Sequence, residues 1–264
     1  MKSSSALRRA LLFGFIAVLL TVGLSAQTQA PPISITVVCD DQPFQKGLTA
    51  APGFACLIQG TEKNILFDTG GKDAAILFHN LAALKLDPGI VELIVISHDD
   101  PQSLGGLLPF LKRRGPTQVF LPASAPPDLV KQIGAAKAQV IPVKDPVSVC
   151  EGVFSSGEMS GEQSLVIDTP KGLVILTGCA HSGIAAVVEK AKSVMPKEVY
   201  LVMGGFHLVD QTGAAASVGR RLRELGVKSI APTHCTGAKA VELLKKEFGK
   251  DFVSAGAGKT IEIR

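Results

Sequence analysis

The chain has 264 residues, of which 46% are hydrophobic and 19% charged, a composition that suits one well-buried domain and excludes a disordered chain. The chain has 27 Lys and Arg residues and 23 Asp and Glu residues. Three of the basic residues and none of the acids lie in segment 1–30, so the rest of the chain has 24 basic and 23 acidic residues. This nearly neutral remainder, with 5% aromatic residues and no Trp, offers neither the basic surface nor the stacking platform that nucleic acid needs.

The first thirty residues form a separate segment. Three basic residues precede an apolar run over residues 11–24, and small and polar residues follow up to Ala26 or Ala30. This order is typical of a secretory signal peptide, and its apolar part is short for a membrane span. We therefore expect a mature domain of residues 31–264 that is periplasmic or secreted and free of the membrane after cleavage; an uncleaved anchor is the alternative.

Hydrophobic patterns in the first part of this domain predict a sheet followed by a helix. Three apolar segments bounded by Gly and Pro turns are typical of successive strands, and they cover residues 33–38, 53–59 and 64–67. Residues 72–86 carry apolar side chains at helical spacing, which makes His79 a helix residue and no more. Asp68, between the last of these strands and the helix, is in its simplest interpretation a turn former.

The apolar run from Val91 to Ile96 is too continuous for a half-solvated strand and predicts a strand covered on both faces. His98 and Asp100 follow it directly and can place two metal-capable groups side by side. Asp99 or Asp100 is equally suited to cap the next helix. The elements expected afterwards are a helix, a strand and a second helix, at residues 104–112, 118–121 and 127–136.

From residue 138 to 177 the pattern changes to short strands with Gly and Pro between them, which predicts a second sheet built from neighbours in sequence. These strands are expected at 138–143, 147–150, 152–156, 164–169 and 172–177. Helices at 187–194, 218–225 and 241–248 then alternate with strands at 198–203, 229–233, 251–255 and 260–263. Strands followed by alternation, occurring twice, predict two sheets packed face to face with helices outside.

Four of the five histidines follow an apolar strand: His98, His181, His207 and His234. Carboxyl ends of strands are where such folds place ligands. Each histidine alone is more often a packed or turn residue, but together they predict a metal site. The segments Leu84–His98 and Leu222–His234 share one pattern of helix end, turn, strand and Ser/Thr-His, so approximate two-fold symmetry would bring both terminal histidines to one edge.

The segment from Val91 to Leu107 resembles the metallo-β-lactamase superfamily, whose hallmark is H-x-H-x-D-H followed by Gly-Gly-Leu. The motifs ILFDTGG, TGCAHSGI, GGFHL and PTHCTG strengthen the resemblance and are similar to the branch of dihydropterin ribofuranosyl-aminobenzene phosphate synthase-like metallo-hydrolases. The likeness spans roughly residues 33–263. It implies an α/β (α+β) domain with the four-layer αββα sandwich of the metallo-β-lactamase type.

The chain departs from this hallmark at its centre. It keeps His98 but has Asp100 for the second histidine, Gln102 for the aspartate and Ser103 for the last histidine. The resemblance therefore implies a divalent metal, zinc, with one ion rather than two. It implies metal ligands at His98, Asp100, Cys179, His181 and His234.

Other positions are expected to support this site. Cys179 stands where related enzymes carry a bridging aspartate or a ligating cysteine, although a small buried residue is equally typical there. Asp68 and Glu162, or Glu158 in its place, are expected behind the ligands. Asp100 and His207 are expected as the catalytic residues, Asp100 also as a metal ligand and His207 as a substrate-contacting group or a donor behind the ligands.

All five cysteines lie beyond residue 30, and their odd number leaves at least one thiol unpaired. Cys179 and Cys235 each sit one or two residues from a histidine, which makes them candidates for the site, although Cys235 is equally typical of a packed thiol. A disulfide would have to be sought among Cys39, Cys56 and Cys150.

The resemblance implies an exported metal-dependent hydrolase that acts on an ester-like or phosphate-containing small molecule. The alternative is a catalytically silent small-molecule-binding protein that retains the fold, and a synthase role is a third possibility. The three altered motif positions favour the silent protein, whereas the retained DTGG, GCAH, GGFH and HCTG loops favour the enzyme. The substrate and the oligomeric state are not specified by the sequence.

Overall fold

The computed structural model describes residues 32–209 and 212–264; the expected signal peptide, residues 1–30, lies outside them. A first sheet of seven strands has the order β13-β1-β2-β3-β4-β5-β6. Its strands are β1 (Ile33–Cys39), β2 (Ala55–Gln59), β3 (Ile65–Phe67), β4 (Leu93–Val95), β5 (Gln118–Pro122), β6 (Gln139–Val143) and β13 (Thr260–Ile263). Its helices are α1 (Ala74–Ala83), α2 (Pro101–Leu104), α3 (Leu107–Arg114) and α4 (Pro127–Ala135).

The second sheet has six strands in the order β12-β11-β10-β9-β8-β7. These are β7 (Val147–Cys150), β8 (Val153–Ser155), β9 (Leu165–Thr169), β10 (Gly172–Thr177), β11 (Val199–Gly205) and β12 (Val227–Thr233). Helices α5 (Ile184–Val194), α6 (Ala215–Glu224) and α7 (Ala238–Phe248) belong to this half. Short 3-10 turns occur at Pro88–Ile90, Thr212–Ala214, His234–Thr236 and Gly249–Asp251.

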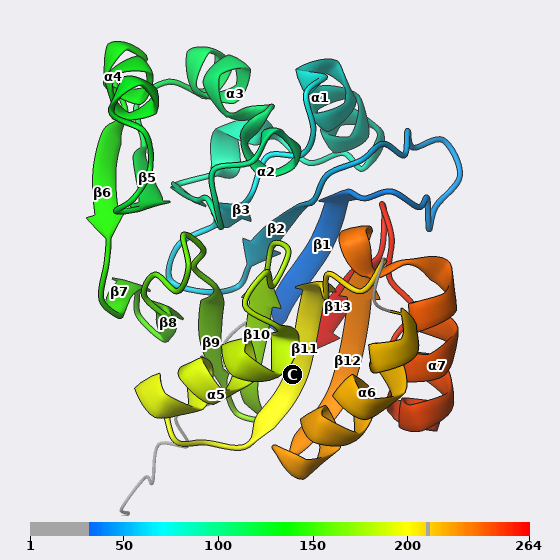
Figure 1. Ribbon diagram of the computed structural model, residues 1–264. Helices are drawn as coiled ribbons and strands as arrows, with labels where there is room; N and C mark the ends of the chain where they lie inside the picture. Colours follow the sequence, from blue (N-terminus) through cyan, green and yellow to red (C-terminus); the bar gives the residue numbers. More distant parts are fainter. Residues whose placement is uncertain (1–31, 210–211) are drawn as a thin grey trace, which may run out of the picture. The chain divides into compact units, whose positions relative to one another are not determined.

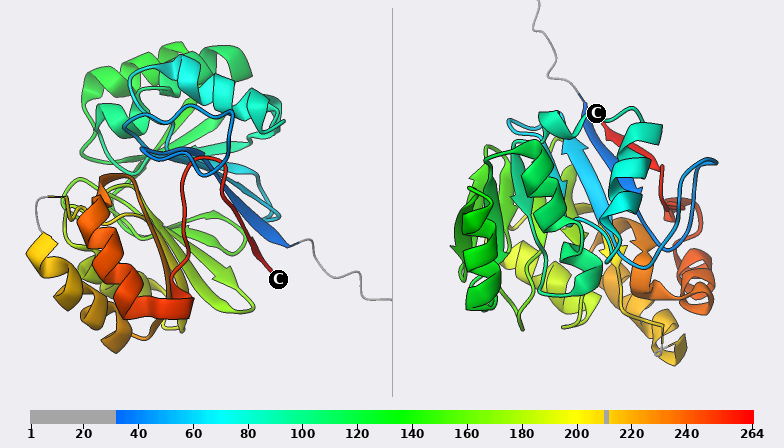
Figure 2. Two further views of the ribbon diagram at one scale, coloured as in Figure 1. Left: turned by 90° about the vertical axis from the view of Figure 1, so that its right-hand side faces the viewer. Right: turned by 90° about the horizontal axis from the view of Figure 1, so that it is seen from above.

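Within residues 32–264 the two sheets face one another, with α1 to α4 on the outer side of the first and α5 to α7 on the outer side of the second (Figures 1 and 2). The core between the sheets is apolar and includes Val37, Phe67, Val95, Leu176 and Met203. Each helix layer adds its own cluster on the far face of its sheet. Burial of this apolar surface is the main force that holds the layers together, and the expected four-layer αββα sandwich is confirmed.

Several expected elements differ from the structure. The strand at residues 139–143 pairs in parallel with β5 and so belongs to the first sheet, not the second. The expected strand at 251–255 is reduced to a single bridge between Ile230 and Phe252. The helix expected at 104–112 is two helices, α2 and α3, joined at Gly105-Gly106. None of the helices in the described part of the chain is long and apolar enough to cross a membrane.

The topology brings several strand ends to one edge. Strands β3, β4, β5 and β6 are parallel neighbours in the first sheet, and β10, β11 and β12 are parallel neighbours in the second. Because parallel strands end on the same side, the loops that follow β4, β10, β11 and β12 meet at one edge of the sandwich. Every site residue described below is on one of these loops or contacts one.

Candidate functional site

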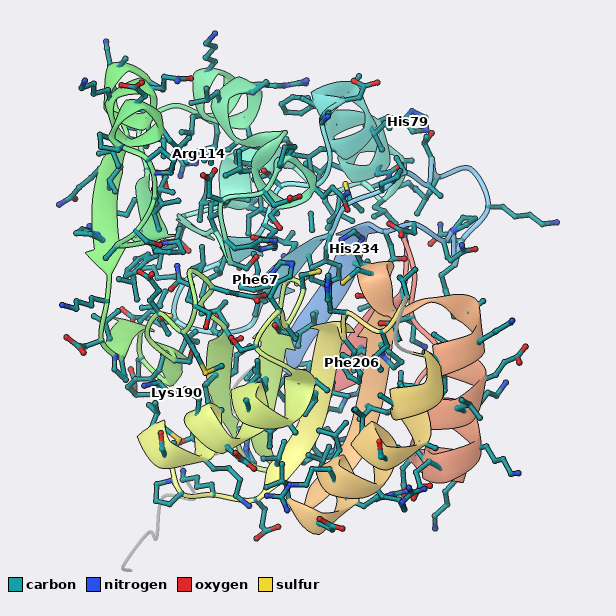
Figure 3. The ribbon with its side chains drawn as sticks, viewed as in Figure 1. Phe67, His79, Arg114, Lys190, Phe206 and His234 are labelled. Carbon is teal, nitrogen blue, oxygen red and sulfur yellow. The ribbon has the colours of Figure 1, made fainter. Side chains whose placement is uncertain are left out.

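Six potential donor side chains converge on the loops after these strands. His98 follows β4, Cys179 and His181 follow β10, His207 follows β11, and His234 and Cys235 follow β12. The ring centroids of His98 and His181 are 4.9 Å apart, and those of His181 and His207 are 4.6 Å apart. In Figure 3 His234 lies where the two halves meet, whereas His79 lies on the outer helix α1.

Two overlapping groups have donor atoms close enough to share an ion. The ligand atoms of Cys179, His234 and Cys235 all lie within 4.8 Å of one another, and so do those of Cys179, His181 and His207. Cys179 is common to both groups and is buried, while His181 and His207 are exposed. The structure thus brings together three of the five expected ligands, Cys179, His181 and His234, and adds Cys235 and His207 to them.

His98 is oriented by a buried hydrogen-bonded chain. Ser97 donates its Oγ hydrogen to Asp68 Oδ2 at 2.7 Å, and its backbone N–H to Asp68 Oδ1 at 2.7 Å. The same Oγ lies 2.8 Å from His98 Nδ1. With Asp68 ionised, the Ser97 hydroxyl must accept a hydrogen from His98 Nδ1, so Nε2 keeps a free lone pair. Ser97 was not singled out from the sequence, although it sits beside His98.

Glu162 holds the loop that carries Cys179 and His181. Its Oε1 accepts hydrogen bonds from the backbone N–H groups of Cys179 and Ala180, at 2.8 and 2.9 Å, and its Oε2 accepts from the N–H of His181 at 2.9 Å. The side chain is 5% exposed. The backbone of Glu162 also forms an isolated antiparallel β-bridge with the backbone of His98. Glu162 therefore lies where the sequence expected a supporting acid, whereas Glu158 accepts from the backbone N–H of Ser124.

His234 is held by two acids at the end of β1. Its Nδ1 lies 2.9 Å from Asp41 Oδ1, and its backbone N–H donates to Asp40 Oδ2 at 3.2 Å. Burial raises the pKa of Asp40 to about 6, against the hydrogen bonds from Gln42 and His234 that lower it. Sequence reasoning missed both acids, because 193 positions separate Asp41 from His234. The Asp-Asp pair directly after a buried strand was the available signal.

The thiols of the two site cysteines are hydrogen-bonded to each other. A hydrogen bond between the thiols lowers the pKa of Cys235 to about 6 and raises the pKa of Cys179. The cause is a proton that stays on Cys179 and is donated to the sulfur of Cys235. Cys179 Sγ also lies 3.2 Å from His207 Nδ1. All five cysteines are in the described residues and all are free, so the disulfide considered among Cys39, Cys56 and Cys150 is absent there.

Backbone strain is concentrated at this site. Seven non-glycine residues in the described part of the chain adopt a left-handed φ, and four of them lie at the site: Asp68 at 56°, Ala180 at 53°, His207 at 50° and His234 at 43°. Such conformations cost of order 1–3 kcal/mol each and persist where surrounding contacts impose them. For Ala180 and His234 these contacts are the hydrogen bonds to Glu162 and Asp40 described above. Their clustering is typical of a functional site.

Comparisons with known proteins place this arrangement in a family. Residues 48–170 match the model of the metallo-beta-lactamase superfamily. A 7,8-dihydropterin-6-methyl-4-(beta-D-ribofuranosyl)-aminobenzene-5'-phosphate synthase from Methanocaldococcus jannaschii is 30% identical over 255 residues, which cover 77% of this chain and 85% of the relative. The chain belongs to the metallo-β-lactamase superfamily.

Solved structures of the superfamily agree with the fold. Tm1679, described as a metal-dependent hydrolase of the beta-lactamase superfamily, is 26% identical with a TM-score of 0.74, over 88% of this chain and 99% of its own. The metallo-beta-lactamase fold protein YhfI from Bacillus subtilis is 16% identical with a TM-score of 0.62, over 88% and 99% of the two chains. The second likeness shows the fold alone.

The altered positions of the metallo-β-lactamase hallmark have structural partners here. Asp100 caps helix α2 by accepting the backbone N–H of Gln102 at 2.8 Å. Ser103 is buried, with its Oγ 3.3 Å from His98 Nδ1. Gln102 is exposed, and its carbonyl oxygen accepts the N–H of Phe54. Asp100 is not in either donor group of the described residues, whereas the His98 ring packs against that of His181.

The buried Asp68 carboxyl group makes the stability of the folded chain depend on pH. Burial raises the pKa of Asp68 from 3.8 to about 7, against hydrogen bonds from Ser97 that lower it. The folded chain therefore holds a proton between about pH 4 and pH 7 that the unfolded chain has released. Protonated Asp68 stabilises the folded chain fully below about pH 4, and this contribution is lost as the pH rises through about 7. At about 1.36 kcal/mol per pKa unit, it amounts to at most about 4 kcal/mol.

We expect Asp68→Asn to remove this part of the pH dependence, because asparagine mimics the protonated carboxyl group. Urea unfolding of both metal-free proteins at several pH values between about 4 and 8 measures it. The difference in unfolding free energy between the two proteins should change across this range. Parallel pH profiles for the two proteins would contradict the assignment.

Proposed function

We propose that this protein is a metal-dependent hydrolase that acts on an ester-like or phosphate-containing small molecule. The observation that carries the proposal is the convergence of His98, Cys179, His181, His207, His234 and Cys235 at one edge of the sandwich. The relative from Methanocaldococcus jannaschii is named for a phosphate-bearing compound, which supports the phosphate class. Export to the periplasm or the exterior belongs to the same proposal and is supported by the pattern of residues 1–30.

The donor set fits zinc. Two thiols and one imidazole within 4.8 Å of one another match the three-ligand sets that zinc takes in catalytic sites with a fourth position left open. When bound there, the ion would activate water and polarise a carbonyl or phosphoryl oxygen. The shared Cys179 favours one ion over two independent ions, because one sulfur would have to serve both groups.

The protein's own residues supply orientation and proton transfer. The Asp68–Ser97 pair keeps the Nε2 lone pair of His98 free, so that this nitrogen can accept a proton from water. His181 and His207 are exposed beside it and are placed to contact the substrate. Glu162 fixes the loop between Cys179 and His181, so that these groups keep one geometry.

One experiment tests the enzyme against the silent binding protein. The full chain is expressed with its own leader and purified without chelator, and its metal content, intact mass and hydrolysis of a generic phosphodiester and a lactone are measured. We expect about one zinc ion per chain, a mass without residues 1–26 or 1–30, and hydrolysis that chelator removes and zinc restores.

The outcomes separate the parts of the proposal. A folded protein that holds metal and hydrolyses neither compound class would favour the small-molecule-binding alternative. Activity that survives complete removal of metal would refute the metal-dependent mechanism. A retained apolar run at residues 11–24 in the intact mass would refute cleavage and leave the hydrolase proposal standing.

A further inference from the structure

The donor atoms offer two ways to hold an ion, and the structure distinguishes between them. Resting on the proposed function, we infer that Cys235, together with Cys179 and His234, holds a thiophilic divalent ion such as Zn²⁺, and that His98, Asp100 and His181 are not its ligands. The site would then lie entirely on the loops after β10 and β12, in the second sheet. Soft sulfur donors favour zinc over magnesium or calcium.

His234 is already oriented as a ligand. Its Nδ1 is 2.9 Å from Asp41 Oδ1, and that oxygen also accepts the backbone N–H of Gly53 at 3.2 Å. The Nε2 nitrogen is therefore the one left for the ion, in the carboxylate–histidine–metal arrangement that fixes ring orientation in zinc proteins. The His234 side chain is 6% exposed, so little side-chain freedom would be lost on binding.

A glycine makes room for the Cys235 sulfur beside the backbone of Cys179. A Cβ atom on Gly205 would lie 2.6 Å from Cys235 Sγ and 3.3 Å from the Cα of Cys179. The missing side chain lets the loop after β12 approach the loop after β10, and Cys235 Sγ lies 3.7 Å from the carbonyl oxygen of Cys179. Gly205 thus lets the Cys235 sulfur lie close to the backbone of Cys179.

The competing group is less suited to an ion. His181 and His207 are both exposed, so ordering them would cost side-chain entropy. His207 Nδ1 already lies 3.2 Å from Cys179 Sγ, and His181 Nδ1 lies 3.4 Å from Glu162 Oε2. His207 is therefore placed to donate a hydrogen bond to the Cys179 sulfur, which supports that sulfur as a ligand.

Cobalt substitution tests the assignment without relying on activity. Metal-free full-length protein is titrated with Co²⁺, and the sulfur-to-cobalt charge-transfer band is recorded for wild type and for Cys235→Ser, Cys179→Ser, His181→Ala and Cys150→Ser. We expect Cys235→Ser and Cys179→Ser to weaken the band and to lower zinc affinity. The loss of affinity should exceed the roughly 10–100-fold loss that is typical when a residue behind a ligand is removed. His181→Ala and Cys150→Ser should keep the band.

Alkylation of the wild-type protein provides a test that needs no variant. Zinc should protect Cys235, the less buried of the two thiols, from iodoacetamide relative to the metal-free protein, as mapped by mass spectrometry. An unprotected Cys235, or a band that depends on His181 and not on Cys235, would overturn the inference. A two-thiolate cobalt spectrum without hydrolysis would refute the proposed enzyme and leave this site standing. Hydrolysis that requires His181 as a ligand would refute this site and leave the proposed enzyme standing.

Discussion

Replacing Glu162 with alanine should lower the free energy of unfolding by about 3–5 kcal/mol. Three backbone N–H groups, of Cys179, Ala180 and His181, would lose their acceptor, at about 1–3 kcal/mol for each buried unpaired group. The relief of a buried carboxylate offsets part of this loss. Because the same loop carries Cys179 and His181, metal affinity should fall with stability. Urea unfolding and cobalt titration measure the two effects.

Two variants serve as controls for this result. Glu162→Gln keeps an oxygen for Cys179 and Ala180 but presents a donor to His181, so it should cost less than the alanine variant. Glu158→Ala removes a nearby acid that accepts only the backbone N–H of Ser124 in the described residues and should change stability little. A Glu162→Ala protein within about 1 kcal/mol of wild type would show that water replaces the carboxylate.

Gly178→Ala should damage both stability and the orientation of His98. A Cβ atom at this position would overlap Ser97 Oγ and lie 2.7 Å from Ser97 Cβ and 2.9 Å from Asp68 Oδ2. Overpacking of this kind typically costs about 1–3 kcal/mol, and Ser97 cannot rotate away without breaking its bonds to Asp68 and His98. We expect a loss at or above the top of this range, measured by urea unfolding.

A nitrogen NMR spectrum of the histidine rings provides the second readout for Gly178→Ala. At about pH 8, where Asp68 is ionised, wild type should show the His98 tautomer with the proton on Nδ1, and the variant should lose that preference. Gly134→Ala is the matched control, because an added Cβ meets nothing within 4 Å there and helix α4 gains from alanine by about 0.4–1 kcal/mol. A stable Gly178→Ala protein with the wild-type His98 tautomer would contradict the prediction.

The sequence predicted which strand ends carry chemistry, because this information is local. A buried apolar run followed by a histidine marks a strand end, and parallel strands then bring such ends together. That reasoning located His98, His181, His207 and His234 at one edge. It left Asp100 open between a helix cap and a metal ligand, because an aspartate before a proline suits both, and here it caps α2.

The remaining errors concern partners far apart in the chain. The apolar character of residues 139–143 does not indicate which sheet this strand joins. Its place beside β5 follows from the strand-helix-strand connection through α4, because such a connection favours a parallel neighbour. The contact of Asp41 with His234 joins the loop after β1 to the loop after β12. Hydrophobic periodicity carries no information about such a pair.

The pairing of β13 with β1 has a consequence for how this protein is made. Residues Ile33 and Ile263 face each other in antiparallel register, so the first sheet cannot close until residue 263 has left the ribosome. During synthesis the outer edge of β1 therefore presents unpaired N–H and C=O groups, which other chains can bind. The nascent chain should depend on a holding chaperone until synthesis has passed β13, and truncation before Thr260 should convert a soluble product into an aggregating one.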